Sequence, residues 1–216
     1  MTLEEIEARL APHWLSVFGG FHPGPGDDAP ANCETLLILG PREPGFWAYV
    51  TAEAEFHDGQ PDPLDRWSRR LIGRIACDLG GKALFPFGGP PYRPFIAWAK
   101  ATGRTWASPV GLLVHDQAGL MVSFRGALAL RDRLVLPPTP PKPPCTGCAR
   151  PCTEACPVGA LHAEAYDVAA CHAHLATEAG QDCRDQGCRA RRVCPVSQTY
   201  GRQVAQSAFH MRSFHP

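Results

Sequence analysis

The chain has 216 residues, of which 44% are hydrophobic and 19% charged, with 21 basic and 21 acidic residues. A formal net charge of zero argues against a broad electrostatic attraction to nucleic acid or acidic lipid. No apolar run approaches the roughly 20 residues that span a bilayer, and the acidic start MTLEEIEARL lacks the regions of a secretory signal. We therefore expect a cytoplasmic protein with no membrane or nucleic-acid partner, folded as one medium domain or two small ones.

Helix signals come first along the chain. Thr2 and Glu5 have the spacing of a capping box before apolar residues at helical spacing. The clearest helix spans 63–79, where Asp62 is placed to cap it and Pro63 suits its first turn. A further helix is expected over 94–103, after a loop at 85–94. The apolar stripe of the 63–79 helix consists of Leu64, Trp67, Leu71, Ile75 and Leu79.

Short apolar or alternating runs between these helices indicate strands. Together with the helices they predict an α+β fold class, with a mixed α/β domain over residues 1–136. The expected strands are 35–40, 46–56, 110–115, 120–124 and 128–136.

A proline-rich segment marks a boundary at 137–144, where six of eight residues are proline. Proline fixes φ and removes a donor, so such a run stays extended and semi-rigid. We interpret 137–144 as a linker between the domain of residues 1–136 and a cysteine-rich domain of residues 145–216.

The cysteine-rich domain holds eight of the ten cysteines, and two of the eight are followed directly by proline. Eight thiolates are the number that two cubane [4Fe–4S] clusters require at four each. The count therefore predicts a bacterial ferredoxin-like double-cluster module. The eight residues are Cys145, Cys148, Cys152, Cys156, Cys171, Cys183, Cys188 and Cys194.

The two Cys-Pro steps suggest how the ligands divide. In two-cluster ferredoxins the cysteine before proline crosses to the other cluster. Applied here, this rule uses each clustered cysteine once. Cluster I then takes Cys145, Cys148, Cys152 and Cys194, and cluster II takes Cys156, Cys171, Cys183 and Cys188.

Zinc is the rival metal, because two zinc sites with four cysteines each also consume eight thiolates. Structural zinc sites usually present paired CxxC knuckles, and this chain has a single CxxC, at Cys145 and Cys148. Disulfides are the third alternative, and a reducing compartment argues against them.

Four arginines lie among the later cysteines, and two interpretations of them remain open. These arginines could raise the reduction potential of a negatively charged cluster or dock an acidic donor, or they could form a solvated basic face. Of the two remaining cysteines, Cys77 falls within the predicted 63–79 helix, where we expect a small buried side chain. The arginines are Arg184, Arg189, Arg191 and Arg192.

From about Trp98 onward the chain resembles the epoxyqueuosine reductase and reductive dehalogenase group. The matching segments are WAKATG (98–103), SPVGLLVHDQAGLMVSF (108–124), CTGCARPCTEACPVGAL (145–161) and YDVAACHAHLATE (166–178). The resemblance implies a nitroreductase-like, corrinoid-binding domain whose cobalt receives electrons from two [4Fe–4S] clusters. The first region is shorter than that domain, and residues 83–98 lack the acid that epoxyqueuosine reductase uses, which argues against queuosine synthesis.

These observations favour an iron–sulfur electron-transfer protein that carries two [4Fe–4S] clusters and exchanges electrons with a redox partner protein. The first alternative is a cobalamin- or flavin-dependent reductase whose clusters feed a cofactor in the N-terminal domain. The second alternative is a zinc-stapled binding module. No nucleophile–base pair or phosphate-binding loop stands out, so the sequence predicts no catalytic residue.

Overall fold

The computed structural model describes residues 1–140 and 142–216, so Pro141 of the predicted linker lies outside the described residues. The chain forms two compact units, and neither unit is a single stretch of sequence. The first comprises residues 1–104 and 123–139, and the second comprises 105–122 and 140–216. Residues 105–122, which the sequence analysis placed in the N-terminal domain, thus fold with the cysteine-rich part.

The first unit is built on a four-stranded antiparallel sheet in the order β1-β2-β6-β3. Both central strands, β2 and β6, are buried along their whole length. The continuous apolar run 35–40 therefore becomes a strand covered on both faces, as predicted. The strands are β1 (Leu15–Phe21), β2 (Thr35–Pro41), β3 (Lys82–Leu84) and β6 (Gly126–Leu130).

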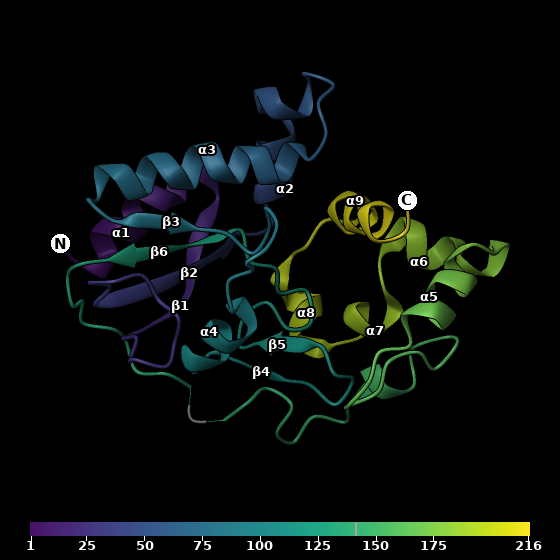
Figure 1. The fold of residues 1–216 in the computed structure, drawn as a ribbon. Coiled ribbons are helices and arrows are strands. Elements are labelled where there is room, and N and C mark those ends of the chain that lie inside the picture. The colour runs from purple at the N-terminus through teal and green to yellow at the C-terminus, as the bar shows by residue number, and fades with distance from the viewer. Residues whose placement is uncertain (141) are drawn as a thin grey trace. The chain divides into compact units, whose positions relative to one another are not determined.

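Helix α3 (Pro63–Asp78) runs across one face of this sheet (Figure 1). Its buried residues include Leu64, Trp67, Leu71 and Ile75, so the predicted stripe faces the core. The predicted cap is wrong, because Asp62 has a left-handed φ of 52° and its side chain forms no capping hydrogen bond. The Asp62 carbonyl oxygen instead accepts hydrogen bonds from the backbone N–H groups that open the helix.

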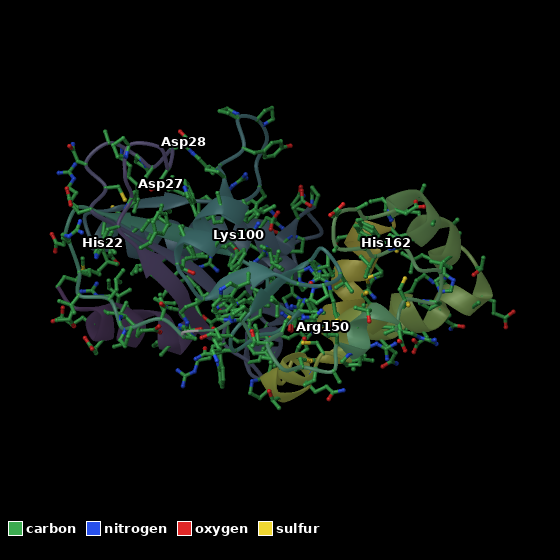
Figure 2. All side chains as sticks on the ribbon, turned by 90° about the horizontal axis from the view of Figure 1, so that it is seen from below. His22, Asp27, Asp28, Lys100, Arg150 and His162 are labelled. Carbon is green, nitrogen blue, oxygen red and sulfur yellow. The ribbon has the colours of Figure 1, made fainter. Side chains whose placement is uncertain are left out.

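The remaining helices of the first unit include one at the N-terminus and one that binds the loop after β1. In α1 (Leu3–Leu10) the predicted capping box is present between Thr2 and Glu5. The loop that follows β1 is tied to α4 (Phe95–Ala101), because Trp98 Nε1 donates to the Asp27 carbonyl at 2.6 Å. Figure 2 labels Asp27 of this loop and Lys100 of α4. The other elements are η1 (Ala11–His13), α2 (Phe46–Thr51) and η2 (Ala54–Phe56).

Three strand predictions need correction. Residues 46–56 form α2 and the turn η2, because Phe46, Trp47 and Val50 bury one helical face. Residues 120–124 form no strand, and 128–136 supplies only the end of β6. The carbonyls of Leu120 and Met121 accept hydrogen bonds from arginine side chains and not from a neighbouring strand.

The second unit consists of short helices and a two-stranded antiparallel sheet of β4 (Thr105–Ala107) and β5 (Leu113–His115). The α+β class is thus confirmed for the chain. No helix among residues 1–140 and 142–216 has the length and apolar character needed to cross a membrane. The helices and turns are η3 (Pro151–Thr153), α5 (Val168–Leu175), η4 (Glu178–Gly180), α6 (Gln181–Gln186), α7 (Arg189–Arg192), α8 (Pro195–Tyr200) and α9 (Val204–Phe214).

Candidate metal centres

Four of the eight clustered cysteines line one pocket of about 310 Å³ in the second unit. They are the four that the sequence analysis assigned to cluster I: Cys145, Cys148, Cys152 and Cys194. Cys152 and Cys194 are buried, whereas Cys145 and Cys148 are half-buried. The rest of the lining is apolar or small, and Arg150 is the one charged side chain among the described residues that form it.

Local backbone geometry brings these four thiols together. The first two lie on a tight turn, in which Cys148 N donates to the Cys145 carbonyl at 3.3 Å and Gly147 takes a φ of 77°. Cys152 follows in the turn η3, which begins at a proline. Cys194 arrives from the far end of the unit as the residue directly before α8, whose first residue is Pro195. Proline suits this position because the first helical turn needs no donor there.

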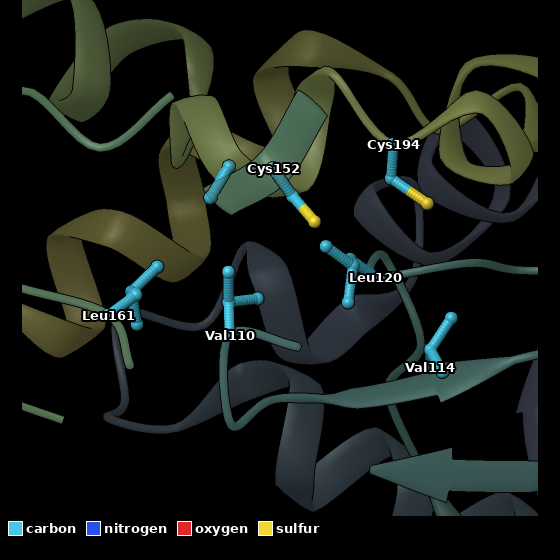
Figure 3. Packing of buried hydrophobic residues seen from close by; sticks show 7 residues of the cluster. Val110, Val114, Leu120, Cys152, Leu161 and Cys194 are labelled. Atoms are coloured by element: carbon cyan, nitrogen blue, oxygen red, sulfur yellow. The ribbon is translucent and has the colours of Figure 1, made fainter. Parts of the chain in front are cut away.

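Segment 105–122 supplies the apolar wall of the pocket. Figure 3 shows the Cys152 side chain extending toward Leu120 within a buried cluster that also contains Val110 and Val114. The backbone of segment 105–122 is held by the later helices, because Leu120 N donates to Ser197 Oγ at 2.9 Å. The Leu120 carbonyl accepts from Arg191 at 2.6 Å. Sequence reasoning missed this wall, since it expected the same residues to be strands of the other domain.

The thiols of this set influence one another electrostatically. Burial raises the pKa of the Cys145 thiol, and the neighbouring charges of Cys152, Cys194 and Cys148 raise it further. Burial likewise raises the pKa of Cys152, again with a contribution from Cys194. Several thiolates in one apolar pocket repel each other unless a positive centre binds them, so the set suits a metal that displaces the protons.

The other four cysteines are those that the sequence analysis assigned to cluster II, and we call them the second set. Burial raises the pKa of Cys171, and the charges of Cys188 and Cys156 add to this. Burial also raises the pKa of Cys183, with a further contribution from Cys188. The charge of Cys188 thus acts on both Cys171 and Cys183, and the charge of Cys156 acts on Cys171. Cys171 belongs to α5, Cys183 to α6, and Cys188 is the residue before α7.

Each set has a backbone N–H group directed at a sulfur atom. Arg150 N donates to Cys148 Sγ at 3.3 Å in the first set. Ala160 N donates to Cys156 Sγ at 3.3 Å in the second. Hydrogen bonds to sulfur offset negative charge and are among the factors that set the potentials of iron–sulfur clusters.

The arginines that the sequence analysis left with two interpretations have partners inside the second unit. Arg189 and Arg192 both bind the Asp182 carboxylate, and Arg189 Nε donates to it at 2.7 Å. Arg184 donates to the carbonyls of Leu175 and Thr177. These contacts connect α5, α6 and α7, so the arginines position the helices that carry the second set.

A single-ion site and a cluster site require different spacings between their thiols. A tetrahedral zinc ion with Zn–S bonds of about 2.3 Å would hold its sulfur atoms about 3.8 Å apart. In the part of the chain that the structure describes, no three His, Cys, Asp or Glu side chains are grouped to bind one metal ion. Each thiolate of a cubane binds its own iron, so the sulfur atoms surround a larger space. The first set supplies four thiols around one pocket, the number of ligands that one cubane needs.

The two remaining cysteines lie in the first unit. Cys33 Sγ donates to the Thr35 carbonyl at 3.4 Å, and burial raises its pKa. The expectation of a buried Cys77 is wrong, because this side chain is exposed. The buried stripe of α3 includes Ile75 and Ala76, and Cys77 lies on the helix surface beyond it.

The chain matches no protein-family model, no curated protein and no solved structure. The functional assignment therefore depends on the chain's own residues and their geometry.

Proposed function

We propose that this protein is an iron–sulfur electron-transfer protein whose second unit binds two [4Fe–4S] clusters. Cys145, Cys148, Cys152 and Cys194 would hold one cluster. The second would be held by Cys156, Cys171, Cys183 and Cys188. Such clusters supply reversible one-electron chemistry, with potentials set by charge, hydrogen bonds and solvent exposure.

The observation that carries this proposal is that four of the eight cysteines line one pocket, in the combination that the ferredoxin crossing rule gives for one cluster. The ferredoxin crossing rule assigns Cys194 to the set of Cys145, Cys148 and Cys152, although it lies 42 positions after Cys152 in the chain. The same four residues line one pocket in the structure. The sequence rule and the pocket lining are independent, and both leave Cys156 out of this first set.

The surrounding residues have definite tasks in this proposal. Val114 and Leu120 keep water from the first set of thiols, and the Arg150 and Ala160 N–H groups offset negative charge on the sulfur atoms. The Asp182 ion pairs keep α6 and α7 in place beside the second set. A redox partner protein would deliver or accept the electron.

Anaerobic purification followed by elemental analysis tests the proposal. Two cubanes predict about eight iron and about eight acid-labile sulfide per chain. Two zinc ions without sulfide would contradict the proposal and favour the zinc-stapled module. Acid precipitation of the same sample tests the reductase alternative, because a bound corrin or flavin would be released into the supernatant.

A further inference from the structure

Arg150 has a backbone conformation that an arginine side chain does not favour. Its φ of 56° and ψ of 48° lie in the left-handed region, and a proline follows it. L-residues with a Cβ adopt this region at a cost in free energy, and a following proline disfavours it further. Elsewhere among the described residues of the second unit, positive φ angles belong to glycines such as Gly147, Gly159 and Gly187.

The backbone contacts of Arg150 do not explain the choice of arginine. Its N–H donates to Cys148 Sγ at 3.3 Å, and its carbonyl accepts from Thr153 N at 3.1 Å. Glycine would make both contacts without strain. The side chain must therefore contribute something that glycine cannot, and its distinguishing property is a permanent positive charge.

The position of that charge is unusual among the arginines of the second unit. Arg150 is exposed (Figure 2), and in the described part of the chain its guanidinium forms no hydrogen bond or ion pair. It is also the one charged side chain in the described lining of the first pocket. By contrast, Arg184, Arg189 and Arg191 are all bonded to partners within the unit.

We propose that the Arg150 guanidinium raises the reduction potential of the cluster held by Cys145, Cys148, Cys152 and Cys194. This inference rests on the proposed function. Reduction by a low-potential one-electron donor adds one negative charge to the cluster and its thiolates, with no bond broken and no proton transferred. A nearby positive charge stabilises the reduced state more than the oxidised state.

The variant Arg150→Asn removes the charge and keeps a residue that tolerates the left-handed region. The variant Arg150→Lys keeps a positive charge, and Arg131→Asn removes an exposed charge that lines no described pocket. Anaerobic titration with dithionite, followed by the electron paramagnetic resonance of the reduced clusters, measures each midpoint potential. Iron and sulfide are quantified on the same samples.

In Arg150→Asn we expect one of the two midpoints to become more negative, while Arg150→Lys and Arg131→Asn stay near wild type. The equilibrium constant for reducing that cluster should fall about three- to tenfold, and a tenfold fall corresponds to about 59 mV for one electron. Unchanged midpoints in Arg150→Asn, or an equal shift in Arg131→Asn, would overturn the inference. Loss of iron from both Arg150→Asn and Arg150→Gly would also overturn it, by making Arg150 an assembly residue. Wild-type protein without iron and sulfide would instead contradict the proposed function.

Discussion

Leu120 offers a direct test of the apolar wall around the first set of cysteines. Its side chain is 1% exposed and packs with Val114, Cys152 and Cys194. Leu120→Ala removes three carbon atoms, worth about 2.4 kcal/mol at about 0.8 kcal/mol per buried CH₂. The cavity that remains adds to this, so we expect a loss of about 2–5 kcal/mol in the free energy of unfolding. The backbone hydrogen bonds of Leu120 do not involve its side chain and should remain.

The matched control is Leu37→Ala, because Leu37 is 0% exposed and lies in β2 of the first unit. Urea denaturation of metal-free protein should show a comparable loss of stability in both variants. The rate of iron release from loaded protein should rise only in Leu120→Ala, and only for about half of the iron, because one pocket becomes open to water. Equal release rates in the two variants, or a stability loss under about 1 kcal/mol in Leu120→Ala, would refute this description of the wall.

Three further predictions concern polar side chains that are partly or fully buried, each measured by urea denaturation. Burial raises the pKa of Glu7, so the ionisation of this carboxyl group opposes folding as the pH rises. Glu7→Gln should therefore be more stable than wild type at pH 7 and equally stable below the unfolded-state pKa of 4.5. A Glu7→Gln variant that is less stable than wild type at pH 7 would count against this. Asp65→Asn removes the acidic partner of Arg125, whose guanidinium lies 3.3 Å from the carboxylate. We expect the free energy of unfolding to fall by about 1–3 kcal/mol. An unchanged denaturation midpoint would show that the ion pair contributes nothing to stability. Gln206 is fully buried, and neither of its amide atoms has a hydrogen-bond partner in the described part of the chain. Gln206→Met should therefore leave the stability of metal-free protein unchanged or raise it by up to about 3 kcal/mol. A destabilised variant would reveal a partner for the amide.

Local signals explain which parts of the fold could be predicted. The capping box of Thr2 and Glu5 and the apolar stripe of α3 involve residues three or four positions apart, and both are present. The segment FWAYV misled because aromatic and β-branched residues favour strands. Its helical state depends on distant packing, such as the Phe46 ring at 5.6 Å from the ring of Trp67.

The wall of the candidate site could not be predicted for a similar reason. The carbonyls of Leu120 and Met121 bond to Arg191 and Arg202, which lie 71 and 81 positions later in the chain. A local pattern cannot reveal such partners, so LMVSF resembled a strand. The placement of Cys194 beside Cys145, Cys148 and Cys152 was accessible from sequence, because the crossing rule ties it to a Cys-Pro step.

The central claim is that the eight cysteines divide into two sets, each holding one four-iron cluster, and the iron content of paired serine variants tests it most directly. Cys152→Ser combined with Cys194→Ser damages one set, whereas Cys152→Ser combined with Cys183→Ser damages both. We predict about four iron per chain in the first double variant and close to none in the second. Equal iron contents in the two double variants would contradict the division.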